Sequence, residues 1–71
     1  MMQHQTQAIV TECFGEFELE LFVTQKGRYW ARARHLPSQL TYISRSFSDV
    51  EEAVEESMRE CIALLPPQKS A

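Results

Sequence analysis

The stretch SDVEEAVEESMRECIALLPP, residues 48–67, decides the fold because it holds a whole helix with its start and stop signals. Ser48 and Glu51 form a capping box, in which the hydroxyl of Ser48 accepts the N–H of Glu51 and the Glu51 carboxylate accepts the N–H of Ser48. Pro66-Pro67 ends the helix. Apolar residues recur at the spacing of one helical face: Val50, Ala53, Val54, Met58, Cys61, Ile62 and Leu65. We therefore predict an amphipathic helix over residues 49–65.

The preceding segment has the pattern of a β-hairpin. Residues 17–24 alternate apolar and polar side chains, which is typical of a half-buried strand. Gln25-Lys26-Gly27 is a three-residue loop with glycine in the left-handed position, and residues 28–36 return as the second strand. This loop length predicts cross-strand pairs of two kinds. Charged and aromatic pairs on one face are Glu18 with Arg34, Glu20 with Arg32 and Phe22 with Trp30; apolar pairs on the other are Leu19 with Ala33, Leu21 with Ala31 and Val23 with Tyr29.

Two further segments favour strands, and each leaves an alternative open. Residues 8–14 precede Gly15, so 8–14 and 16–24 are either one bulged strand or a tight hairpin. In residues 40–47 we expect Ile43 and Phe47 to face the helix; the opposite choice directs Leu40 and Tyr42 towards it.

The predicted fold class is α+β, with an antiparallel three- or four-stranded sheet and one C-terminal amphipathic helix packed on one face. The domain spans residues 8–66, between a disordered N-terminus at 1–7 and a disordered tail at 67–71.

Length and composition narrow the classes of function. A chain of 71 residues builds a small core, and such domains often gain stability by oligomerising. The net charge of −3 disfavours nucleic acid as the partner. No apolar run is long enough to cross a membrane and no signal-peptide pattern begins the chain, so we expect a cytoplasmic protein of bacterial type with no membrane partner. Cys13 and Cys61 are expected to be buried thiols, and no spacing indicates an enzyme, a metal site or a cofactor.

Two surfaces are candidates for binding a partner. The outer sheet face is expected to carry Phe22, Arg28, Trp30, Arg32 and Arg34. Aromatic and arginine side chains on a sheet suit stacked bases and phosphates, and they are also enriched where proteins associate. The alternative is a solvated ladder of ion pairs, since Glu18 and Glu20 neutralise two of the arginines. We expect a symmetric homodimer, formed either by pairing of exposed strand edges or by stacking of this sheet face, which buries Trp30 and Phe22.

The second candidate surface is the acidic face of the helix. It carries Glu52, Glu55 and Glu56 opposite the apolar stripe. It suits a basic protein partner, or it serves only as a solubilising surface.

Residues 18–64 resemble the HicB-like antitoxin domain, a degenerate RNase H-like fold. The matching residues are Gly27-Arg28-Tyr29, Leu36-Pro37 and Ser48-Asp49-Val50-Glu51-Glu52-Ala53. The chain departs from the family at Pro37-Ser38-Gln39, where Pro-Gly-Cys is common, and we expect it to lack the DNA-binding domain that many such antitoxins carry after the helix. The resemblance implies a non-catalytic protein that binds a partner such as a basic toxin nuclease.

A second resemblance is to the strand-rich repeat of single-stranded nucleic-acid binders of the Whirly and Pur type. Lys26-Gly27-Arg28-Tyr29, followed by a strand and a terminal amphipathic helix, is similar to that repeat. It implies that the arginine and aromatic side chains of the outer sheet face bind nucleic acid.

Overall fold

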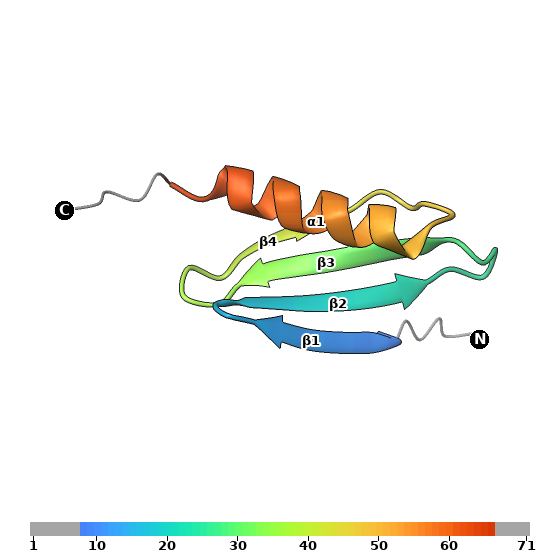
Figure 1. The fold of residues 1–71 in the computed structure, drawn as a ribbon, viewed down its shortest axis with the longest axis horizontal. Helices are drawn as coiled ribbons and strands as arrows, with labels where there is room; N and C mark the ends of the chain where they lie inside the picture. The colour runs from blue at the N-terminus through green and yellow to red at the C-terminus, as the bar shows by residue number, and fades with distance from the viewer. Residues whose placement is uncertain (1–7, 67–71) are drawn as a thin grey trace, which may run out of the picture.

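A computed structural model describes residues 8–66 of the chain as one antiparallel sheet with a helix on one face (Figure 1). The sheet order follows the chain order, β1-β2-β3-β4. The elements are β1 Val10–Phe14, β2 Phe17–Val23, β3 Tyr29–His35, β4 Leu40–Ile43 and α1 Val50–Leu64. This confirms the predicted α+β class, and of the three- and four-stranded alternatives the sheet has four strands. The segments 1–7 and 67–71, expected to be disordered, lie outside the described residues.

The central hairpin of β2 and β3 has the predicted register throughout. Phe22 pairs with Trp30, Glu20 with Arg32 and Glu18 with Arg34. The loop is closed by a hydrogen bond of 3.0 Å from the N–H of Gly27 to the carbonyl of Thr24. Gly27 has φ +80°, a backbone conformation that only glycine adopts readily.

The open question at Gly15 is resolved as a tight hairpin. Phe14 pairs with Phe17, so Gly15 and Glu16 form a two-residue loop between β1 and β2. Gly15 has φ +57°, as expected for glycine at the first central position of such a turn.

The last strand is irregular, which explains why its facing was ambiguous. Tyr42 lies opposite Ala33 and packs against the core, whereas Ile43 is 53% exposed on the outer face. The expectation that Ile43 faces the helix is therefore wrong. The alternation then breaks: the Ala31 N–H donates to the side-chain Oγ of Ser44, and Phe47 resumes pairing with Tyr29 one residue out of step. This slip returns Phe47 to the core side, as predicted.

The helix begins one residue later than predicted, because Asp49 rather than Ser48 is the N-cap. The Asp49 carboxylate accepts the N–H of Glu51 at 3.1 Å, and Asp49 has extended φ and ψ angles. The predicted capping box at Ser48 is wrong. Phe47 exchanges both of its backbone hydrogen bonds with Tyr29, which keeps the chain extended up to Ser48. The helix therefore starts after Asp49 and ends before the Leu65 C-cap.

Small side chains form the centre of the helix–sheet contact. Ala31 and Ala33 of β3 and Ala53 and Cys61 of α1 are fully buried, and Leu19 and Leu21 of β2 are nearly so. Short side chains let the helix lie close to the sheet. The helix packs mainly on β3, then on β4, and least on β2, so β1 at the far edge stays uncovered (Figure 1).

Candidate interaction surfaces

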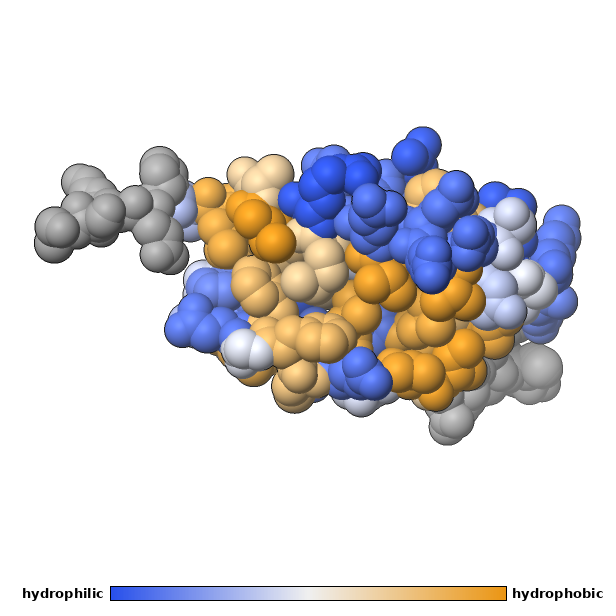
Figure 2. Space-filling view, in the orientation of Figure 1, coloured by the Kyte–Doolittle hydropathy of each residue, from blue (hydrophilic) through white to orange (hydrophobic). Residues whose placement is uncertain are grey.

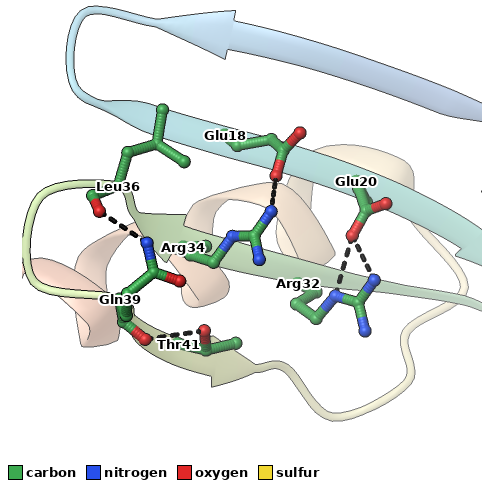
Figure 3. A network of polar contacts seen from close by, with 7 residues as sticks. All are labelled: Glu18, Glu20, Arg32, Arg34, Leu36, Gln39 and Thr41. Carbon is green, nitrogen blue, oxygen red and sulfur yellow. Dashed lines mark hydrogen bonds and ion pairs between the residues drawn. The ribbon is translucent and has the colours of Figure 1, made fainter.

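The outer face of the sheet carries a ladder of ion pairs. Arg32 donates to the Glu20 carboxylate through Nε at 2.8 Å and through a second nitrogen, and Arg34 donates to Glu18 (Figure 3). Each guanidinium lies directly across β2–β3 from its carboxylate, as the predicted register requires. The side chains of Arg32 and Arg34 remain 41% and 43% exposed. The two predicted arginine sites are therefore present on this face, but both are already neutralised within the chain.

An aromatic stack continues this face towards the Gln25–Gly27 loop. The rings of Phe22 and Trp30 are 4.1 Å apart between centroids and nearly parallel, at 10°. The guanidinium of Arg32 lies 5.5 Å from the centre of the Phe22 ring. Phe22 is only 4% exposed, so its predicted role as an exposed contact is wrong: its neighbours cover it. Trp30 is half-buried and is the member of the pair that reaches the surface.

The arginine at the start of this face is held differently. Arg28 is exposed, and its guanidinium donates to the hydroxyl and the carbonyl of Ser46, at 3.2 and 2.9 Å. It forms no ion pair with a carboxylate of residues 8–66.

An exposed isoleucine adds apolar surface to this face. Ile43 lies directly opposite Arg32 and is 53% exposed. The outer face thus combines a tryptophan, arginines and an exposed aliphatic side chain.

The acidic helix face is divided by the structure. Glu52 and Glu55 are exposed and line a shallow pocket of about 160 Å³ with Arg45, Phe47 and Arg59. Glu56 also borders this pocket but is only 7% exposed, so its predicted place on an open acidic surface is wrong.

Glu56 is instead engaged by Arg45 of the segment before the helix. One carboxylate oxygen accepts the backbone N–H of Arg45 at 3.0 Å, and the other accepts its guanidinium Nε at 3.0 Å. These hydrogen bonds hold the pKa of the Glu56 carboxyl below its ordinary value. The sequence pattern alone put Glu56 on the solvent side. Its partner, Arg45, lies in the irregular segment between β4 and α1, and that pairing has no local signature in the sequence.

A third surface, which the sequence did not indicate, lies on the helix side of the sheet beyond α1. Val10 and Phe14 of β1 and Val23 of β2 alternate onto this side and are 43%, 46% and 41% exposed. Figure 2 shows hydrophobic surface beside α1, over β1 and β2, interrupted by hydrophilic atoms. The available signal was the alternation of Val10, Glu12 and Phe14, which is decisive only once β1 is known to be a separate strand.

A hydrogen-bonded chain of three polar side chains joins the two turns at one end of the sheet. His35 Nδ1 lies 2.8 Å from Ser38 Oγ, and Nε2 lies 3.2 Å from a Glu16 oxygen. The Ser38 hydroxyl also accepts the N–H of Leu40, and the Glu16 side chain is 68% exposed. The arrangement ties the turn after β1 to the turn after β3.

The two thiols differ, contrary to the expectation that both are buried. Cys61 is fully buried, and burial raises the pKa of its thiol. Cys13 is exposed, because it lies opposite Glu18 on the outer face of the edge strand β1, away from the helix.

Within residues 8–66, no three His, Cys, Asp or Glu side chains are close enough together to hold a metal ion. In the same part of the chain, no helix has the length and apolarity to span a membrane. Comparison with protein-family models, with curated proteins and with solved structures gives no match.

Proposed function

We propose that this chain is a non-catalytic protein-association domain of the HicB-like antitoxin type, acting in the bacterial cytoplasm as a homodimer. The observation that carries association is the composition of the outer sheet face, which combines Trp30 with arginines and the exposed Ile43. Tryptophan and arginine are the residue types that most often anchor protein interfaces.

The size of the core supports the same proposal. The fully buried side chains are short, and the largest of them among the described residues are Cys61 and Ser57. A domain that buries so little apolar surface on its own gains stability from covering more of it. Two-fold pairing of the outer faces would cover Trp30 and Ile43 in both copies, and two-fold dimers are the commonest oligomers.

Nucleic-acid binding of the Whirly or Pur type is the weaker alternative. Two of the three arginines on the outer face already pair with Glu18 and Glu20, so a phosphate would have to displace a carboxylate that carries the same sign of charge. Arg28 is the remaining cation there. A labelled single-stranded oligonucleotide at low salt tests the alternative: tight binding that weakens steeply with salt would favour it over protein association.

A basic protein is a second candidate partner. Glu52 and Glu55 are exposed and form no ion pair within residues 8–66. They leave negative charge at the rim of the helix pocket, which suits lysine or arginine side chains of a partner such as a toxin nuclease.

Sedimentation of the purified chain at micromolar concentration tests the homodimer. We expect twice the mass of one chain, and we expect Trp30→Ala to weaken the dimer by roughly 2 kcal/mol or more. Ile43→Lys is a second interface variant that leaves the Phe22–Trp30 stack intact. Thr41→Ala, a small change on the same face opposite Arg34, is the matched control and should leave the dimer unchanged. A monomeric mass for the unmodified chain would contradict the homodimer.

A further inference from the structure

The free edge of β1 presents unpaired backbone groups to solvent. The Thr24 N–H donates to the Arg28 carbonyl at 2.7 Å, which makes the even-numbered residues of β2 the ones that bond to β3. The odd-numbered residues, among them Leu19 and Leu21, therefore bond to β1. In the observed register their partners on β1 are Glu12 and Val10.

The backbone groups of the intervening residues of β1 point away from β2. Thr11 and Cys13 direct their N–H and C=O groups outward, away from β2. All five residues of the strand are exposed, and the helix does not cover it. Such an edge is a template for another strand.

The side chains along this edge have a definite chemical pattern. On the helix side they run apolar, acidic, apolar: Val10, Glu12 and Phe14. Glu12 forms no ion pair or hydrogen bond with any residue of 8–66. By contrast, the glutamates that do form ion pairs are Glu16, Glu18, Glu20, Glu56 and Glu60. Glu12 is thus an unmatched charge in the middle of an apolar strip.

We propose that β1 binds an extended segment of a partner protein as a fifth, antiparallel strand, and that this segment has the pattern apolar–x–basic–x–apolar. Its basic side chain pairs with Glu12, its apolar side chains cover Val10 and Phe14, and its backbone bonds to Thr11 and Cys13. This inference rests on the proposed role in protein association and names a second surface for it.

The same pattern disfavours a second copy of the chain at this edge. The self-pairing centred on β1 places Glu12 opposite Glu12 of the other copy, in a non-hydrogen-bonded pair whose side chains are closest. Like charges directly opposite are destabilising. Shifting the register by two residues, which keeps the same hydrogen-bonding pattern, sets Glu12 against Val10 or Phe14 and leaves the carboxylate without a counter-charge.

The test is an NMR titration of the isotope-labelled full-length chain with two short blocked peptides. In one, valine, lysine and valine alternate with threonine; in the other, glutamate replaces the lysine. We expect the lysine peptide to shift the amide signals of residues 10–14 in a saturable way, and the glutamate peptide to bind about two- to fivefold more weakly or not at all.

Three variants sharpen the result. Glu12→Lys should reverse the preference between the two peptides, and Glu52→Lys, the same charge change on the helix, should not. Thr11→Pro removes an outward N–H from an edge position where proline is tolerated, so it should abolish binding of both peptides while the circular dichroism spectrum is retained.

Equal binding of both peptides, or shifts confined to other surfaces, would overturn the proposal. If neither peptide binds while Trp30-dependent dimers persist in sedimentation, the strand-binding edge fails and the association domain stands. If the chain is monomeric but the lysine peptide binds at β1, the homodimer fails and the edge stands.

Discussion

The carboxylate of Glu56 satisfies the backbone N–H of Arg45 at a point where the last strand has no regular partner. The N–H lies 3.0 Å from one carboxylate oxygen, and the guanidinium of the same arginine lies against the other. The Glu56 side chain is 9% exposed and that of Arg45 is 76% exposed. The helix is therefore joined to the irregular segment after β4 by a charged clamp whose acidic half is inside.

This clamp predicts a loss of stability in acid. Because the pKa of Glu56 is lower in the folded chain, its contribution is fully present above the ordinary value of 4.5 and is lost as the pH falls through the folded value. We expect Glu56→Gln to be less stable than the unmodified chain near neutral pH, with the gap closing below about pH 4.5. Urea unfolding across this range is the measurement. Glu52→Gln controls for the loss of one helix carboxylate. The prediction would be contradicted if the difference in unfolding free energy between Glu56→Gln and the unmodified chain stayed constant down to pH 3.

The observed N-cap predicts that two adjacent substitutions differ. Asp49→Ala should cost about 1 kcal/mol by removing the acceptor for the Glu51 N–H. In a domain of this size that lowers the melting temperature by roughly 4–8 °C. Ser48→Ala is the matched control and should leave the melting curve nearly unchanged. Equal losses at both positions would mean that Ser48 shares the capping role.

A substitution at Gly27 in the Gln25–Gly27 loop should lower the free energy of unfolding through its effect on the backbone alone. A Cβ added at Gly27 would meet no atom within 4 Å, yet φ is +80° there. Gly27→Ala should therefore destabilise the fold by roughly 1–2 kcal/mol through the left-handed conformation alone. Gly27→Asn should recover part of that loss, because asparagine tolerates this region better. The three unfolding free energies can be compared directly, and an alanine variant as stable as the unmodified chain would refute the argument.

The two cysteines should react at very different rates with a thiol reagent such as Ellman's. Cys13 is exposed, whereas Cys61 is fully buried and its thiol pKa is raised by burial. We expect one thiol per chain to react rapidly in the native state and the second to react only on unfolding. Cys13→Ser should abolish the rapid phase. A rapid phase that survives this change would show that Cys61 is accessible.

The hairpin of β2 and β3 was predictable in full because several local signals agree. The glycine of the loop, the charge pairs and the separation of Leu21 from Arg32 onto opposite faces all select the same register. The sequence could not decide which side chains on the outer face of the sheet are buried by their neighbours. Alternation put Phe22 on the outer face correctly, but it could not show that the Trp30 ring and the Arg32 guanidinium lie against Phe22 and that its side chain is buried.

The errors cluster between β4 and the helix, and they share one cause. Ser48 and Asp49 are about equally good N-caps, so the choice depends on where the strand ends. That point is set by the long-range pairing of Phe47 with Tyr29, after the alternation has slipped near Ser44. The same slip brings Arg45 to Glu56. A slip of this kind has no local signature, so a regular strand was the reasonable expectation.

The complete burial of Ala31, Ala33 and Ala53 in one core cluster has a consequence for how this sequence can change over time. None of the three has any exposed surface, so a methyl group added to one of them cannot extend into solvent and must displace the helix. A larger residue at one of these positions is tolerable only where a neighbour shrinks. Natural variants of this chain should therefore alter these positions jointly or leave them as they are, while exposed residues such as Gln25 drift independently.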